Sequence, residues 1–324
     1  MTRILITGGG GFVGQKLALE LARTGRLRSQ DITSLTLVDI NDPKEPKAPF
    51  DVNTVTADLS EPQVVQALMH DGFDVIYHLA AVVSGSAEAD FDLGMRVNLT
   101  GTMNVFEEAR RLHTCPIIVY ASSVAVHGGE APEVIDDGME LNPQTSYGTQ
   151  KAMGELLLND MTRKGFIDGR GLRLPTVSIR PGKANTAASS FMSAIFREPM
   201  QGEPSNCPVS RDFAVWHTAP RTIIHNLLHA AELDGDAFGY NRCFNLPGRT
   251  DTIGEMIAAM TRVAGPDPEK LITWNSDPVI EKIVHGWRNH IRSDRGQSLG
   301  FVADESFENS VRWFLDDDHR DRAS

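Results

Sequence analysis

The chain has 324 residues, enough to bury a sizeable core in one large domain or two unequal ones. Its formal net charge of -12 at pH 7 argues against a nucleic-acid or anionic-membrane surface, and no apolar run is long enough to span a membrane. The three cysteines are odd in number and far apart, and they predict neither a disulfide framework nor a zinc site. A strand-like run starts at Arg3, and no signal peptide is predicted. We therefore expect a cytoplasmic protein without metal.

The first predicted elements are a short buried strand at residues 4–6 and an amphipathic helix at residues 15–23. Between them lies the turn Thr7-Gly8-Gly9-Gly10-Gly11-Phe12-Val13-Gly14. Glycines let the backbone turn tightly and approach a pyrophosphate, and the helix N-terminus offers free N–H groups to it. The alternative is a glycine turn that packs helix on strand without a ligand, but the flanking strand and helix are the context that nucleotide binding demands.

The second predicted strand, at residues 35–39, ends in Asp39. A carboxylate at this point accepts hydrogen bonds from a ribose diol and repels a 2′-phosphate, and no Arg or Lys follows at once. This pattern favours NAD over NADP. The alternative is that Asp39 only begins the proline-containing loop that follows.

Strands and helices alternate through about residue 180. Further strands are predicted at 52–57, 74–81, 116–121 and 173–181, and helices at 62–70, 92–112 and 146–164. The alternation predicts an α/β fold, a Rossmann-type doubly wound parallel sheet with helices on both faces. Ligands of such sheets bind beyond the carboxyl ends of the strands, where five predicted residues fall: Gly8, Asp39, Asp58, Ala80 and Ser123.

The chain is expected to divide into two parts. We place a nucleotide-binding domain at residues 1–175 and a smaller, mainly substrate-binding C-terminal lobe at residues 176–324, with some of its segments returning to the first domain. A helix is predicted at 222–232, and amphipathic helices predicted at 253–263 and 307–314 are expected to cover the lobe. His225 and His229 have metal-compatible spacing but lack the zinc-protease glutamate, so we interpret both as helix-face residues.

Tyr147 and Lys151 lie four positions apart in a predicted helix and therefore share one face of it. Pro143 and Ser146 are its predicted start signals. A lysine ammonium one turn away favours the phenolate, and lowering the tyrosine pKa by about three units would take about 4 kcal/mol. Tyr147 would then be a usable general base near neutral pH. The alternative is a helix with an exposed tyrosine and a solvated lysine, which the pair alone does not exclude.

Together these motifs resemble the extended short-chain dehydrogenase/reductase superfamily. The matches follow one another with fitting spacing: the glycine turn, Asp39, Asp58-Leu59, the run His78-Leu79-Ala80-Ala81, Asn98, Ser123, and Tyr147 with Lys151. His127 is a departure, because most members have a tyrosine there, and we leave it out of the catalytic set. We interpret His78 as structural.

The resemblance implies an NAD-dependent enzyme in which Tyr147 is the acid/base, Lys151 its pKa partner, and Ser123 the hydroxyl that orients the reacting oxygen. It implies cofactor contacts from Gly8, Gly11, Phe12, Val13, Asp39, Asp58, Leu59, Leu79, Ala80, Ala81, Asn98, Ser122, Tyr147, Lys151, Pro175 and Val177. By analogy, helices 92–112 and 146–164 would pair with those of a second copy in a homodimer.

The loop after the predicted strand at 173–181 combines two bases, an amide and several hydroxyls. This composition suits a small polyhydroxylated anion, and the alternative is a surface loop with a helix N-cap at Ser189. The predicted substrate contacts are Ser84, Ser123, Tyr147, Thr176, Arg180, Lys183, Ser190 and Arg211. For Arg211 a structural ion pair stays open as an alternative.

The stretch 172–191 also resembles one narrower group of the superfamily, which acts on the four-carbon sugar acid D-erythronate. The implied reaction is oxidation of the C2 hydroxyl to the 2-oxo acid with NAD, in sugar-acid catabolism. A nucleotide-sugar 4-epimerase is the alternative, since it uses the same catalytic residues. Val124-Ala125 replaces the Asp-Glu pair usual in a dehydratase, and a non-catalytic NAD-binding scaffold would commonly lack Tyr147 or Lys151.

Overall fold

The computed structural model describes residues 2–182, 188–284, 286–287 and 289–319 of the chain. Contacts between residues divide the chain into two compact units. The first unit is built from Met1–Val126, Leu141–Leu174 and Ile224–Phe244, and the second from His127–Glu140, Pro175–Ile223 and Asn245–Ser324. Each unit is thus assembled from stretches that are far apart in the sequence.

The first unit is organised on an eight-stranded sheet in the order β12-β8-β6-β5-β1-β3-β2, with β4 paired to β3. The strands are β1 (Thr2–Thr7), β2 (Arg26–Leu27), β3 (Gln30–Asp39), β4 (Asp51–Thr56), β5 (Val75–His78), β6 (Ile117–Ser123), β8 (Asp168–Leu174) and β12 (Cys243–Asn245). The strands from β4 to β8 pair in parallel, whereas β2 and β3 form an antiparallel pair. The predicted doubly wound parallel sheet is confirmed.

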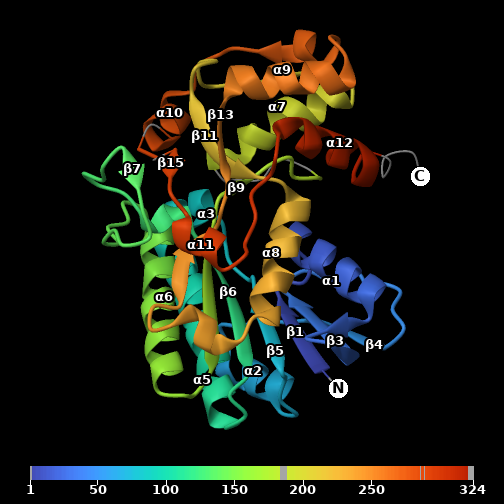
Figure 1. Ribbon diagram of the computed structural model, residues 1–324, viewed down its shortest axis with the longest axis vertical. Coiled ribbons are helices and arrows are strands. Elements are labelled where there is room, and N and C mark those ends of the chain that lie inside the picture. The colour runs from blue at the N-terminus through green and yellow to red at the C-terminus, as the bar shows by residue number, and fades with distance from the viewer. Residues whose placement is uncertain (1, 183–187, 285, 288, 320–324) are drawn as a thin grey trace. The chain divides into compact units, whose positions relative to one another are not determined.

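The helices of the first unit cover both faces of this sheet. The chain runs from β1 to β3 through α1 (Phe12–Thr24), and in the opposite direction across the sheet through α2 (Pro62–Met69), α5 (Gly101–Arg111) and α6 (Ser146–Arg163). Because such crossovers are right-handed, the two sets lie on opposite faces. Figure 1 shows α5 and α6 side by side, with α1 across the sheet from them. The winding direction reverses at β1, and ligands of open α/β sheets bind beyond the strand ends at such a point.

The segment expected as one helix at 92–112 is interrupted. It consists of α4 (Phe91–Gly94), a π-helical stretch at Met95–Thr100, and α5. Inside the π-helical stretch the buried Asn98 side chain accepts a hydrogen bond from Val82 N at 2.8 Å and donates one to Gln150 Oε1 at 2.8 Å. The prediction of a continuous α-helix is therefore wrong in its middle. These contacts are tertiary, so helical periodicity gives no sign of them.

The strand predicted at 173–181 is displaced. The sheet strand is β8, which ends at Leu174, and β9 (Thr176–Val177) belongs to another sheet in the second unit. Pro175 separates them, because proline has no N–H for a strand ladder. The start of β8 was missed because it contains glycines, which are rare in strands. Here they are needed: a Cβ on Gly169 would lie 2.6 Å from Leu158 Cγ, and one on Gly171 would lie 2.3 Å from Cys243 Sγ.

The second unit has a three-stranded sheet in the order β13-β11-β9, with β11 at Ala214–Thr218 and β13 at Arg249–Thr252. Its core packs the apolar faces of α7 (Phe191–Met200), α9 (Ile253–Ala264) and α12 (Phe307–Asp317). Two small strand pairs join β10 (Ser205–Asn206) to β14 (Ile272–Thr273) and β7 (Val134–Ile135) to β15 (His290–Ile291).

The remaining helices and 3₁₀ turns complete the described chain. They are α3 (Ser84–Ala89), α8 (Pro220–Glu232), α10 (Pro278–Val284), α11 (Asp294–Ser298) and the 3₁₀ turns Val124–Val126, Ala188–Ser190, Gly235–Phe238 and Pro268–Leu271. Within the described residues, no helix has the length and apolar character needed to cross a membrane.

Candidate active site

The first turn of α6 lies against the end of β6. The helix is capped by Thr145, whose Oγ1 accepts a hydrogen bond from Gly148 N at 3.1 Å, so the predicted start signals Pro143 and Ser146 are not its cap. A Cβ on Gly148 would lie 2.1 Å from Ala125 O, in the turn that follows β6. Position 148 therefore tolerates only glycine. This contact brings Tyr147, the residue before it, to the end of β6.

Ser123, Tyr147 and Lys151 come together in the first unit. Ser123 ends β6, and its hydroxyl is hydrogen-bonded to the Tyr147 phenol. Lys151 is buried, with Nζ 5.8 Å from the centroid of the Tyr147 ring and 4.9 Å from that of Tyr120. Lys151 Nζ also donates to Ala121 O at 2.8 Å. The three residues predicted as catalytic are thus neighbours, although their roles stay predictions.

Burial sets the charge states of this trio. It raises the pKa of Tyr147 to about 12, although the hydrogen bond with Ser123 lowers it in part. It lowers the pKa of Lys151 to about 8, and the nearby Glu155 carboxylate acts in the opposite direction. Burial therefore moves the pKa of Tyr147 away from neutrality, because it disfavours the charged phenolate, and the role of Lys151 as pKa partner stays a prediction. At pH 7 the chain holds a neutral phenol beside a charged lysine.

The glycine turn has the shape that a pyrophosphate needs. Gly8 has a φ of 73°, and a Cβ there would lie 2.8 Å from Ala80 N. A Cβ on Gly14 would lie 2.3 Å from Gly8 O, so α1 packs directly on the turn. Gly11 caps α1 without a side-chain hydrogen bond, which leaves the N–H groups of the first helical turn, including those of Phe12 and Val13, for an anion. These features fit a dinucleotide.

Asp39 lies at the end of β3, beside the glycine turn. Its carboxylate accepts hydrogen bonds from Gly10 N and Asn41 N, each at 3.1 Å, which fixes the side chain at the turn. Asp58, at the end of β4, is bound instead by Ser60 Oγ at 2.7 Å and by Arg96 Nη1 at 2.7 Å. Both acids are placed as a nucleotide site requires, and their contacts with the cofactor stay predictions.

His78 is the centre of a buried hydrogen-bond chain in the first unit. Thr102 Oγ1 donates to Asn98 O at 2.7 Å, so it must accept from His78 Nε2, which lies 2.8 Å away. His78 Nδ1 then accepts from Thr7 Oγ1 at 2.7 Å, and Thr7 Oγ1 accepts from Ala80 N at 3.3 Å. The chain defines a neutral imidazole and holds the backbone after β5, where cofactor contacts are expected at Leu79, Ala80 and Ala81.

In the second unit, Arg180 is a mostly buried cation. Its Nη2 donates to Ser189 O at 3.0 Å, and its backbone N donates to Ser193 Oγ at 3.1 Å. No carboxylate among the described residues pairs with it. Burial and the neighbouring Arg197 lower the pKa of Arg180 to about 10. An unpaired guanidinium in these surroundings is suited to a carboxylate ligand.

The other predicted substrate residues have different settings. Arg211 is half-exposed, pairs with Glu269 at 2.8 Å, and lies 4.9 Å from the Trp274 ring centroid, as the structural alternative expects. Ser190 ends a 3₁₀ turn, Thr176 lies in β9, and Ser84 begins α3. Lys183 lies outside the described residues. Pro175 and Val177, expected at the cofactor, also belong to the second unit.

Three residues that support the trio were missed in the sequence. Thr145 and Gly148 shape the start of α6, and a threonine three residues before a glycine is too common a pattern to single out. Glu155 follows Lys151 by four positions, so helical spacing could have found it. His127, the departure from the superfamily pattern, donates from Nε2 to Asn245 Oδ1 at 2.9 Å within the second unit. The described residues contain no cluster of three potential metal ligands.

Comparisons with known proteins agree with this geometry. A model of the NAD dependent epimerase/dehydratase family matches residues 4–226. A protein of Cupriavidus necator named D-erythronate dehydrogenase is 46% identical over 318 residues, which is 97% of this chain and 98% of the relative. One of the same name from Haemophilus influenzae is 40% identical, over 98% of this chain and 99% of the relative. A crystal structure described as a nucleoside-diphosphate-sugar epimerase from Agrobacterium tumefaciens has a TM-score of 0.94 at 41% identity, covering 98% of this chain and 94% of that one.

The His78 chain predicts a pH dependence of stability. Burial lowers the pKa of His78 to about 3, below its ordinary value of 6.5. As the pH falls below 6.5 the unfolded chain takes up a proton that the folded chain refuses, so stability should drop by up to about 1.4 kcal/mol per pH unit. Urea unfolding between pH 7 and 5 should show this slope in the parent and a smaller one in His78→Gln.

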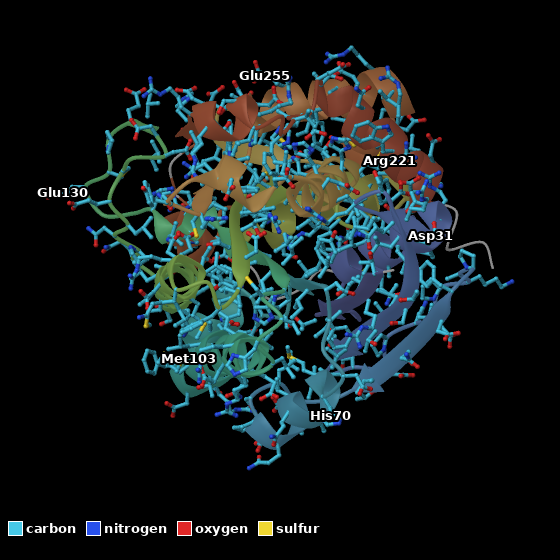
Figure 2. All side chains as sticks on the ribbon, turned by 60° about the horizontal axis from the view of Figure 1, so that its bottom comes forward. Asp31, His70, Met103, Glu130, Arg221 and Glu255 are labelled. Atoms are coloured by element: carbon cyan, nitrogen blue, oxygen red, sulfur yellow. The ribbon has the colours of Figure 1, made fainter. Side chains whose placement is uncertain are left out.

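His70 supplies the matched control for this experiment. It is exposed at the end of α2 and lies at the surface in Figure 2. His70→Gln should keep the parent slope. An equal slope in the parent and in His78→Gln would contradict the assignment of a buried, neutral His78.

Proposed function

We propose that the chain is an NAD-dependent dehydrogenase that oxidises the C2 hydroxyl of D-erythronate to the 2-oxo acid. The chain belongs to the NAD dependent epimerase/dehydratase family. The observation that carries the proposal is the match to two D-erythronate dehydrogenases over almost the whole of every chain compared. The adjacent Ser123, Tyr147 and Lys151 supply the chemistry that such an enzyme requires. The reaction would serve sugar-acid catabolism.

The cofactor we propose is NAD rather than NADP. Asp39 would accept the ribose hydroxyls, and its carboxylate would repel a 2′-phosphate. The N-terminal turn of α1, from Gly11 to Val13, would bind the pyrophosphate, and Asp58 and Leu59 would face the adenine. Leu79, Ala80, Ala81, Asn98, Ser122, Pro175 and Val177 complete the proposed cofactor contacts.

The proposed mechanism is a coupled loss of a proton and a hydride from the substrate. Bound NAD would supply the hydride acceptor. Tyr147 would take the proton of the C2 hydroxyl, and Ser123 would hold the same oxygen by a hydrogen bond. Because burial raises the pKa of Tyr147 to about 12, the phenolate needs the positive charge of Lys151 at its side to form. Lys151 would therefore stabilise the anion rather than exchange protons itself.

For the substrate carboxylate we propose Arg180. It is the buried cation of the second unit that the described residues leave without an acid, whereas Arg211 already pairs with Glu269. Ser84, Thr176 and Ser190 are the proposed partners of the hydroxyl groups. Lys183 stays a candidate from the sequence alone.

A nucleotide-sugar 4-epimerase is the second candidate, favoured by the description of the similar Agrobacterium tumefaciens structure. An epimerase uses the same tyrosine and lysine but returns the hydride to its substrate. It would therefore interconvert a sugar nucleotide without accumulating NADH.

We also propose a homodimer through α5 and α6. Met103 on α5 is 47% exposed and Leu156 on α6 is 66% exposed, which gives both helices an apolar outer surface. Figure 2 shows Met103 at the periphery of the first unit. Exposed apolar side chains on two helices that contact one another are the feature on which this proposal rests.

The activity is tested by following NADH absorbance with NAD and D-erythronate, L-threonate, D-threonate or a panel of UDP-sugars. D-erythronate should give the highest rate, and NADP in place of NAD should give little activity.

Tyr147→Phe should lower kcat by about a hundredfold to ten-thousandfold, the usual contribution of an acid/base group, without weakening NAD binding. Tyr240→Phe is the control, because that tyrosine is fully exposed. Interconversion of a UDP-sugar without net NADH would favour the epimerase, and full activity of Tyr147→Phe would refute its role.

Arg180→Met should raise the KM for D-erythronate and lower kcat/KM by about a hundredfold, since a charge-assisted contact with a carboxylate is lost. The KM for NAD should not change, and Arg180→Lys should recover part of the loss. Arg211→Met is the companion variant and should keep the parent KM. If the KM for D-erythronate rose in Arg211→Met and stayed unchanged in Arg180→Met, Arg211 rather than Arg180 would bind the substrate carboxylate.

Leu156→Glu should convert the dimer to a monomer, measured by light scattering after size exclusion, because it places a charge in an apolar interface. Leu19→Glu on α1 is the control, since Leu19 is 57% exposed on the opposite face of the sheet. A parent mass of one chain, or a dimer that survives Leu156→Glu, would overturn the proposed interface.

A further inference from the structure

A buried carboxylate lies one helical turn beyond Lys151. Glu155 is 1% exposed and accepts a hydrogen bond from Ser122 Oγ at 2.5 Å. Arg173 binds the same carboxylate through Nη2 at 2.8 Å and through Nε at 3.0 Å. Arg173 is itself 3% exposed, so the pair is almost entirely removed from water.

The pair connects α6 to two adjacent strands. Ser122 of β6 and Arg173 of β8 are register partners in the sheet, so both reach the same side chain on the helix. Ser122 immediately precedes Ser123, the hydroxyl that bonds Tyr147. Three successive turns of α6 are thus bound near the end of β6, through Tyr147 to Ser123, Lys151 to Ala121 O, and Glu155 to Ser122.

The helix lies unusually close to the strand at this place. A Cβ on Gly154 would lie 2.3 Å from Tyr120 Oη, and the Tyr120 ring packs against His78 and Phe106, with ring centroids 5.9 and 5.8 Å away. Small changes in the depth or rotation of α6 would therefore move Lys151 relative to Ser123. A contact that fixes Glu155 also fixes the turn that carries Lys151.

Stability alone is a weak reason for this ion pair. Taking two charges out of water costs about as much as their attraction returns, and apolar residues of similar size often serve equally well. The charge of Glu155 has a second neighbour, however. Lys151 lies four positions before Glu155, one turn away on the same helix, and the Glu155 charge favours the ammonium form of Lys151.

The surroundings of Lys151 leave Glu155 as its counter-charge. The titratable or charged groups that face this region are His78 of β5, Tyr120 of β6, Tyr147 and Glu155 of α6, Arg173 of β8 and Cys243 of β12. Burial lowers the pKa of Lys151 to about 8, and the carboxylate of Glu155 opposes that shift. His78 is neutral, and the Tyr120 phenol is kept neutral by burial.

We propose that Glu155 is a positioning residue of the reaction: it fixes the Lys151 turn of α6 through Ser122 and Arg173 and is the anion that keeps Lys151 an ammonium ion. This inference rests on the proposed dehydrogenase chemistry at Tyr147 and Lys151. It assigns to Glu155 no contact with substrate or cofactor.

The first test is the pH dependence of kcat/KM for D-erythronate in the parent, Glu155→Gln and Glu155→Asp. We expect Lys151, with a pKa of about 8, to lose its proton on the alkaline limb of the profile. Removing an adjacent opposite charge should move that limb to lower pH by about one unit or more, which is at least tenfold in rate at a fixed pH on the limb. Glu155→Asp keeps the charge and should keep the limb, even if its overall rate is lower.

Asp160→Asn is the matched control on the same helix. Asp160 forms an exposed pair with Arg163 at 2.7 Å, so its loss should leave the profile unchanged. If Glu155→Gln folds poorly, the double variant Glu155→Gln/Arg173→Met removes both buried charges and should show the same displaced limb. An unmoved limb in the single and double variants, with only a lower Tm, would make Glu155 merely structural.

A second measurement does not need turnover. Because the folded pKa of Lys151 lies below the unfolded value, the parent should gain stability as the pH rises above about 8. In urea unfolding, this gain should begin at a lower pH in Glu155→Gln and should be absent from Lys151→Met. If the parent protein formed no NADH from D-erythronate, the proposed function would be overturned. If the unfolding profile of Glu155→Gln were not shifted, the role of Glu155 would be overturned.

Discussion

The close approach of α6 to β6 is the constraint on which the candidate site depends. Two glycines permit it, since a Cβ on Gly148 would meet Ala125 O at 2.1 Å and one on Gly154 would meet Tyr120 Oη at 2.3 Å. The approach places Tyr147 within hydrogen-bonding reach of Ser123 and lets Lys151 bond to a carbonyl of the strand. A helix kept away by ordinary side chains would carry the same residues without assembling them.

The same approach also sets the electrostatics. By excluding water it raises the pKa of Tyr147 and lowers that of Lys151, so the charged form of each group becomes less favourable. The Glu155 carboxylate opposes the lowered pKa of Lys151, and Arg173 in turn binds that carboxylate inside the protein. The geometry of catalysis and the electrostatic support for it are therefore linked, because close packing creates a desolvation cost that only further buried charges can offset.

Much of the first unit is predictable from its sequence, because its signals are local. The glycine turn between strand and helix, Asp39 at a strand end, and Tyr147 four residues before Lys151 follow from spacing alone. What failed depends on tertiary contact. The start of β8 is hidden by glycines that make room for Leu158 and Cys243, and the π-helical stretch depends on the contacts of Asn98. For Tyr147, spacing shows the lysine nearby but not the burial that raises the pKa of the phenol.

The second unit shows why substrate residues are harder to infer than catalytic ones. In the sequence, Arg180 and Arg211 are equivalent, each a base within a polar stretch. In the structure, Arg211 has an acid and an aromatic ring as partners, whereas Arg180 is buried among serines and carbonyl groups. Leaving a buried cation without an acid is costly, and such a cost is compensated when a ligand brings the missing charge. The specificity of the enzyme for an acid would then arise from an arginine that the fold desolvates but does not neutralise.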